Sequence, residues 1–229
     1  MRGLQRVVCI VGASLVAAHA QQPLQAGGSG YFGIGVNWVQ VGELSRQLQN
    51  AGYGELRSWM VGIGGGGMGR IQRLLIGGEG YGLVEQKAAA MGKEARLSGG
   101  YGFFTLGYTV AEPAGVSLAL LGGIGGGSLG LSLVRDSTIS FGELLANPAG
   151  AVELRTGGWL LQAGVVAEAV FARGLLLTVR AGWILPLGWS GFEIGDRAVA
   201  GAPKATLGGA YVRVGIGGSS PRRWMRDGD

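Results

Sequence analysis

The sequence predicts an all-β protein, an eight-stranded antiparallel up-and-down transmembrane β-barrel with short turns at one end and long loops at the other. Three observations lead to this fold. Large apolar residues alternate with small or polar residues along several segments, each about as long as the 9–11 residues that cross a bilayer at a tilt. The whole chain has 49 glycines among its 229 residues, and glycine is abundant inside those segments. The connections between them alternate between long and short.

The segment Leu175–Leu187 shows the alternation most clearly. One face of this segment carries Leu175, Leu177, Val179, Ala181, Trp183 and Leu185. The other face carries Leu176, Thr178, Arg180, Gly182 and Ile184. A strand with one apolar face and a charge on the other is typical of a membrane-spanning strand in a barrel.

The overall composition excludes two other classes of glycine-rich protein. Glycine follows no three-residue period, which excludes a collagen-like chain. The hydrophobic fraction of 47% disfavours simple disorder. No apolar run reaches about 18 residues without glycine or charge, so a helical membrane protein is not expected.

Residues 1–20 have the features of a cleavable secretory signal peptide: a basic start, an apolar run and an A-x-A motif at residues 18–20. Cleavage after this motif would remove Cys9 and His19, the only cysteine and the only histidine. The mature chain would then have no Ser-His-Asp site, no Cys/His zinc site and no disulfide. We therefore expect no cofactor and no metal.

The charge of the mature chain points to no particular partner. Loss of Arg2 and Arg6 would leave 17 basic and 14 acidic residues, a net charge of about +3. No run of Lys or Arg is long enough for a nucleic-acid footprint, so no nucleic acid is expected. Loop carboxylates such as Glu143 and Glu153 could form a catalytic pair, but nothing fixes their separation, and the protein is expected not to be an enzyme.

The mature chain divides into a short lead at residues 21–29, a barrel at residues 30–217 and a polar C-terminal tail at residues 218–229. Leu44, Leu48 and Ala51 have the spacing of a short amphipathic helix after the first strand. The eight predicted strands cover residues 30–40, 58–68, 74–84, 99–110, 116–134, 159–171, 175–187 and 207–217.

The connections between these strands alternate in length. The long ones are residues 41–56, 85–96, 135–157 and 186–206, and the short ones are residues 69–73, 111–115 and 172–174. Short turns on one rim and long loops on the other are the pattern of outer-membrane barrels.

In strand count, loop alternation and signal peptide, the chain resembles the small eight-stranded outer-membrane β-barrels of diderm bacteria. The resemblance implies a place in the outer membrane, with the short turns in the periplasm and the long loops outside the cell. It also implies two partners, outer-membrane lipid and the insertion machinery. Members of the family often end on an aromatic residue of the last strand, whereas here residues 219–229 form a polar tail.

Four charged residues are predicted to face the barrel interior: Glu79, Glu168, Arg180 and Arg213. An eight-stranded barrel is just wide enough for side chains to fill it. We therefore favour a paired plug that neutralises the buried charge. A path for protons or ions is the alternative.

Two glycine-rich stretches, residues 62–67 and 125–130, match G-x-G-x-x-G. Neither lies in a βαβ unit with an acidic residue about 20 positions on, so nucleotide binding is not predicted. Glycine in a strand more often marks a bulge, a bend or a place where an aromatic ring covers the backbone. We expect a bulge near residues 125–127, and Tyr31, Tyr81 and Tyr101 are candidates for such covering rings.

Two further sets of residues are singled out by their positions. Tryptophans near the strand ends are expected to form an aromatic girdle at the membrane interface: Trp38, Trp59, Trp159 and Trp183. Apolar residues of the long loops either pack on one another as a lid or form a contact surface for another protein or a second copy. They are Leu44, Leu48, Phe141, Leu144, Leu145, Trp189, Phe192 and Ile194.

The sequence leaves three functions open. The leading one is a non-enzymatic outer-membrane barrel with a structural or surface-interaction role through its long extracellular loops. The second is a narrow, porin-like channel for ions or small solutes. The third is a secreted glycine-rich β-protein that self-assembles.

Overall fold

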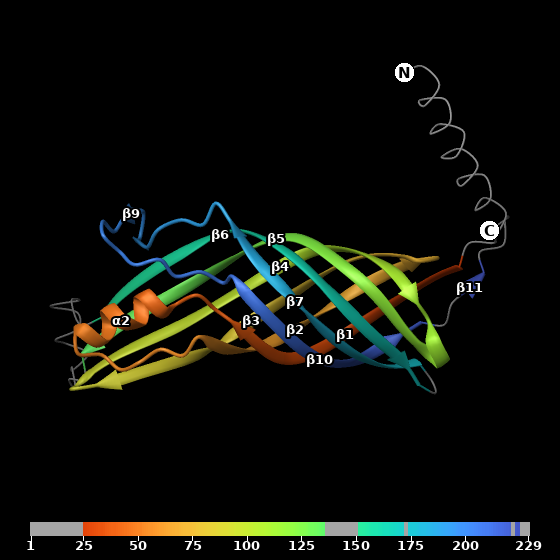
Figure 1. The fold of residues 1–229 in the computed structure, drawn as a ribbon, viewed down its shortest axis with the longest axis horizontal. Coiled ribbons are helices and arrows are strands. Elements are labelled where there is room, and N and C mark those ends of the chain that lie inside the picture. Colours follow the sequence, from red (N-terminus) through yellow and green to blue (C-terminus); the bar gives the residue numbers. More distant parts are fainter. Residues whose placement is uncertain (1–24, 136–150, 172–173, 221–222, 225–229) are drawn as a thin grey trace, which may run out of the picture.

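The computed structural model describes residues 25–135, 151–171, 174–220 and 223–224. Its eight long strands form one closed antiparallel barrel (Figure 1). They are β1 (Gln25–Trp38), β2 (Trp59–Ile71), β3 (Leu74–Ala90), β4 (Lys93–Ala111), β5 (Val116–Arg135), β6 (Ala151–Val170), β7 (Leu175–Leu187) and β10 (Gly209–Ser219). Each pairs with its neighbour in the chain, and β10 pairs with β1 to close the ring. The predicted all-β, eight-stranded up-and-down barrel is confirmed.

Smaller elements lie at the two ends of the barrel. They are the helix α2 (Gly42–Asn50), the 3-10 turn η1 (Pro113–Gly115) and the two-residue strands β8 (Glu193–Ile194), β9 (Arg197–Ala198) and β11 (Arg223–Trp224). The helix confirms the amphipathic segment predicted within residues 41–56. Within the described ranges, no helix has the length and hydropathy needed to cross a membrane.

The long link predicted at residues 85–96 is wrong. β3 and β4 continue through this region, and only Met91 and Gly92 form the turn, both with positive φ. Alternate residues of the hairpin, such as Ala88 and Ala95, are buried at the loop end of the barrel. The side chains that alternate with charged residues in this segment are small alanines. The segment keeps the period of two, but its apolar signal is too weak to predict a strand.

Two further predictions about β5 and β6 need correction. β6 begins at Ala151, inside the predicted loop 135–157, because its first residues pair in register with the end of β5. The bulge expected at residues 125–127 is absent from the continuous β4–β5 register, and the irregularity lies instead between Thr109 and Ala111 of β4. The glycines of β5 thus permit close strand approach without adding an unpaired residue.

The predicted boundaries at the chain ends also shift. β1 begins at Gln25, within the predicted lead, and the pair Gln25–Ala26 is bonded to β11 in the predicted tail. β11 and the start of β1 lie at the short-turn end of the barrel (Figure 1). The predicted signal peptide, residues 1–20, lies outside the described residues.

The barrel is longer on one side than on the other. Strands β3 to β6 have 17 to 20 residues, whereas β1, β2, β7 and β10 have 11 to 14. The longer strands project at the loop end, where α2 and β9 lie beside them (Figure 1). Leu44 and Leu48 of α2 are buried there in the same apolar cluster as Ala88 and Leu97. The helix therefore covers the loop end of the barrel.

The two faces of the wall differ in chemistry and in exposure. Inward positions carry buried Tyr, Thr, Gln, Glu and Arg side chains together with buried apolar side chains such as Leu97 and Leu129. Outward positions on all eight strands carry large apolar side chains that remain exposed. Examples, one from each strand, are Phe32, Ile63, Ile76, Leu106, Leu120, Val165, Val179 and Val214.

Glycines on the inner face make room for the interior side chains. A Cβ added to Gly66 of β2 would lie 2.8 Å from the Cβ of Glu79 on β3. A Cβ added to Gly126, on the outer face of β5, would meet its nearest neighbour at an ordinary 3.6 Å. The inner glycine is therefore required by packing against Glu79, whereas the outer one is not.

We predict that Gly66→Ala lowers the free energy of unfolding by about 1–3 kcal/mol, the usual cost of overpacking. Gly126→Ala is the matched control and should change it by less than about 0.5 kcal/mol. Urea-unfolding midpoints of the two purified variants, compared with the parent chain, measure the difference. Equal effects of the two substitutions would contradict this account of the inner glycines.

Candidate functional site

The four predicted interior charges lie inside the barrel, on four different strands. Glu79 is on β3, Glu168 on β6, Arg180 on β7 and Arg213 on β10, and all four are buried. Arg180 and Arg213 are each only 1% exposed. Such charges are tolerated away from water only when they are paired and hydrogen-bonded.

Glu79 is the centre of this cluster. Its Oε2 accepts hydrogen bonds from Arg180 Nη1 at 2.9 Å and from the Tyr31 hydroxyl at 2.7 Å. Its Oε1 accepts hydrogen bonds from Arg213 Nη1 at 2.8 Å and from Gln162 Nε2 at 2.7 Å. One carboxylate therefore ties together five strands: β1, β3, β6, β7 and β10.

The charges continue from Glu79 towards the short-turn end. Arg180 Nη2 lies 3.5 Å from Glu168 Oε1, and Glu168 Oε2 lies 3.6 Å from Arg70 Nη2. Arg70 Nη1 in turn donates to Glu112 Oε1 at 2.6 Å. Six residues of alternating sign thus form what we call the ion-pair ladder: Arg213, Glu79, Arg180, Glu168, Arg70 and Glu112.

Sequence analysis missed the last two members of the ladder. The sequence pattern predicts Arg70 in the short connection 69–73, but β2 continues to Ile71 and places Arg70 inward. The available signal was its spacing of two from Met68, a buried inward residue. Glu112 lies in the turn before η1, where a period of two gives no information.

Aromatic rings enclose the two deepest arginines. The Arg213 guanidinium carbon lies 3.8 Å from the ring centroid of Tyr211 and 4.3 Å from that of Tyr81. The corresponding carbon of Arg180 lies 4.2 Å from the ring of Tyr31. Cation–π contacts of this kind gain strength away from water. All three tyrosines expected to cover glycine backbone thus lie against arginine guanidiniums, since the Arg213 carbon also lies 5.3 Å from the Tyr101 ring centroid.

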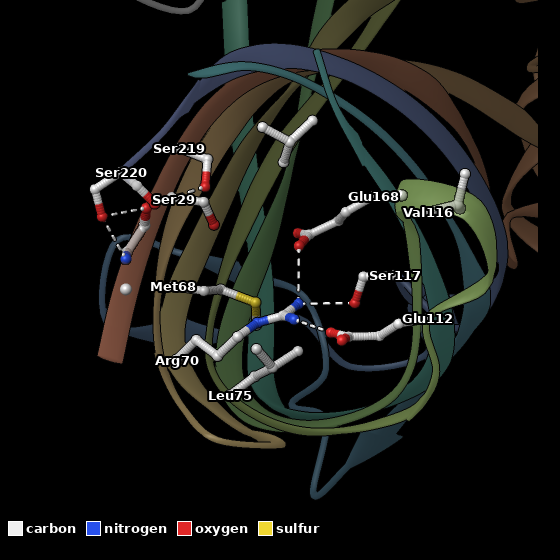
Figure 2. A pocket seen from close by; sticks show the side chains of 14 residues that line it. Ser29, Met68, Arg70, Leu75, Glu112, Val116, Ser117, Glu168, Ser219 and Ser220 are labelled. Carbon is white, nitrogen blue, oxygen red and sulfur yellow. Dashed lines mark hydrogen bonds and ion pairs between the residues drawn. The ribbon is translucent and has the colours of Figure 1, made fainter. Parts of the chain in front are cut away.

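An open cavity of about 430 Å³ lies at the short-turn end of the ladder. Figure 2 shows Arg70 reaching across it, with its guanidinium between Glu112, Ser117 and Glu168. Arg70 Nη2 also donates to Ser117 Oγ at 2.8 Å. Ser219 and Ser220 line the opposite side of the same cavity (Figure 2). The ion-pair ladder is therefore reached from this end through a cavity that has both polar and apolar lining residues, among them Met68 and Leu75.

The loop end of the interior is apolar and closed. Leu97, Leu129 and Leu160 are fully buried, each with no exposed area. They belong to one cluster with Leu44 and Leu48 of α2. An apolar layer and the helix above it therefore separate the ion-pair ladder from the loop end.

The predicted loop contact residues fall into three groups. Leu44, Leu48 and Phe192 are buried, and Trp189 packs against the same cluster. Ile194 of β8 is exposed. Phe141, Leu144 and Leu145 lie outside the described residues. The sequence left open whether these residues form a lid or a contact surface for another molecule, and the buried group has the packing expected of a lid.

The four predicted girdle tryptophans all lie on the outer face and are exposed: Trp38, Trp59, Trp159 and Trp183. Trp38 and Trp59 are direct partners across β1 and β2, at the loop end of both strands. Of the two candidate catalytic carboxylates, Glu153 is exposed and ion-paired with Arg155, and Glu143 lies outside the described residues. The part of the chain that the structure describes contains no group of three or more His, Cys, Asp or Glu side chains suited to hold a metal ion.

Comparison with known proteins gives no family for this chain. No family model matches the sequence, and no curated protein matches it either. The fold and the interior cluster are thus the observations from which a function has to be argued.

We predict that Glu79→Gln lowers the free energy of unfolding by about 3–5 kcal/mol, because it leaves Arg213 buried without a carboxylate. Glu153→Gln is the control, since it breaks an exposed pair with Arg155 and should cost about 1 kcal/mol or less. Denaturant titration followed by tryptophan fluorescence measures both. A small loss for both variants would show that the buried cluster contributes little to stability.

Proposed function

We propose that the protein is an integral outer-membrane β-barrel with a structural or surface-interaction role and no catalytic activity. One observation carries this proposal: the exposed apolar belt that runs over all eight strands. Monomeric water-soluble proteins rarely expose a contiguous apolar patch of more than a few hundred Å². A belt around a closed barrel with a polar interior is the arrangement that lipid stabilises.

Backbone pairing supports the same proposal. In hydrocarbon every backbone N–H and C=O must be bonded within the protein, which a closed barrel achieves without a free edge. The ring here is closed by the β1–β10 and β5–β6 pairings. Closure also removes the exposed strand edges through which a glycine-rich β-protein would self-assemble, so the third hypothesis is disfavoured.

The orientation follows from the two ends of the barrel. The ends of the described chain, at β1 and β11, lie with the short turns, which face the periplasm in barrels of this kind. The longer strands and α2 would then lie outside the cell. Export by the predicted signal peptide and contact with the insertion machinery belong to the same proposal.

The proposed role in surface interaction rests on the extracellular end. The apolar side of α2 is buried against the barrel, whereas Glu43, Arg46, Gln47 and Gln49 are exposed on its other side. The helix thus presents a rigid polar surface above the membrane. Rigid support and polar display suit recognition of another molecule better than transport.

We predict that Val214→Arg impairs folding into lipid. Val214 lies at the middle of β10, is exposed, and pairs with Ile34 and Val179. An arginine there should cost about 2–4 kcal/mol if the belt faces the bilayer core. The parent chain, folded into phosphatidylcholine vesicles, should migrate differently in dodecyl sulfate gels before and after boiling, and the variant should show less of the unboiled, folded band.

Met91→Arg is the matched control, since Met91 is exposed at the tip of the β3–β4 hairpin, beyond the barrel. It should fold into vesicles like the parent chain. Full folding of the Val214 variant, or a parent chain that stays in solution without detergent and shows no gel shift, would contradict the proposal.

We predict that the reconstituted protein is electrically silent in planar bilayers, in contrast to a porin-like channel. The ion-pair ladder fills the middle of the barrel, and the apolar layer of Leu97, Leu129 and Leu160 closes its loop end. Single-channel recording over both voltage polarities tests this prediction. Reproducible unit conductance steps would instead favour the channel.

A further inference from the structure

An open cavity of about 530 Å³ lies at the loop end, between α2 and the segment that leads into β2. Its polar lining includes Arg46 and Gln49 of α2 and Glu55, Arg57 and Ser58 of that segment. Trp59, exposed on the outer face at the start of β2, also lines the cavity. The cavity therefore lies directly beside the edge of the apolar belt.

The framework of this cavity is held by specific hydrogen bonds. The Leu56 N–H donates to Ser45 Oγ at 2.9 Å, which joins the segment to α2. Gln86 of β3 accepts from the Arg57 N–H at 3.0 Å and donates to the Trp59 carbonyl at 2.8 Å. These bonds hold the backbone of Arg57, which lies just before β2, and of Trp59, the first residue of β2.

The two arginines of the cavity have no carboxylate partner. The Arg57 guanidinium carbon lies 5.3 Å from the Trp59 ring centroid, and neither Arg57 nor Arg46 belongs to an ion pair among the described residues. All the other arginines described above as site members, such as Arg70, Arg180 and Arg213, are paired. With Glu55 as the one acidic residue of its lining, the cavity carries a net charge of about +1.

We propose that this cavity binds the phosphate of a membrane lipid headgroup. Guanidinium groups bind phosphate through paired, charge-assisted hydrogen bonds. Tryptophan and arginine at the edge of an apolar belt lie at headgroup depth, where the ring contacts the lipid and the cation meets the phosphate. The inference rests on the proposed function, because it places the cavity beside the outer leaflet.

The position of Arg57 favours a lipid phosphate over a free one. Its guanidinium lies over Trp59, whose partner Trp38 continues the same outward row on β1. A headgroup at this site would have its acyl chains along the exposed belt below. Free phosphate would use the arginines alone and would gain nothing from the tryptophans.

The test uses the full mature chain in a nonionic detergent that contains no phosphate. Binding of dihexanoyl phosphatidic acid, followed by tryptophan fluorescence, should weaken by about 10-fold or more in Arg46→Gln and in Arg57→Gln, since each removes a charge-assisted contact. Arg197→Gln is the matched control, because Arg197 of β9 is an exposed loop-end arginine that does not line the cavity. It should bind like the parent chain.

Three results would overturn the inference. One is equal binding by the parent chain and both cavity variants. The second is no binding by the parent chain, and the third is inorganic phosphate binding as tightly as the lipid, which would mark a site for free anions. Each variant is first shown by its gel shift to fold, so that a failure of the folded barrel to bind in detergent counts against this cavity and leaves the proposed membrane function intact.

Discussion

The carboxylate of Glu79, held between Arg180 and Arg213, is the interaction on which the rest of the interior depends. This carboxylate joins strands that are far apart around the ring. With the hydrogen bonds from Tyr31 and Gln162 added, each of its two oxygens accepts two hydrogen bonds. A barrel whose outer face is apolar cannot rely on a purely apolar core to distinguish inside from outside. Buried pairs of opposite charge supply that distinction, because an inverted wall would move these charges to the outer face and leave them unpaired.

The need to bury these large polar side chains inside the barrel also explains glycines on its inner face. Side chains that fill a narrow barrel need space on the neighbouring strand, and inner glycines provide it: Gly66 lies beside its partner Glu79, and Gly127 lies beside its partner Tyr101 and beside Leu207. A composition with 49 glycines therefore reflects a crowded interior as well as a strongly curved sheet. Gly126 on the outer face has room for a methyl group, so packing within the chain does not account for that glycine.

The sequence predicted the parts of the structure in which a period of two is strong. The barrel, its strand count and the inward direction of Glu79, Glu168, Arg180 and Arg213 all follow from that alternation. The prediction from alternation failed at the β3–β4 hairpin, where alanines weakened the apolar pattern. It also failed at Arg70, where β2 continues beyond the residues that show the pattern. The pairing partners were out of reach, because the ladder depends on the stagger between strands, which no single strand encodes. The cavity at Arg46 and Arg57 likewise depends on how α2 folds back on the barrel.

The two ends of the barrel interior differ, and this asymmetry bears on the proposed role. At the short-turn end the ladder reaches an open polar cavity, where Arg70 and Glu112 can meet water. At the loop end leucines and α2 exclude it. A transport path needs polar groups at both ends, whereas an anchor needs its exposed end to be rigid. The apolar cluster at the loop end holds α2 against the barrel, and this packing agrees with the proposed role in surface interaction better than with passage of a solute through the barrel.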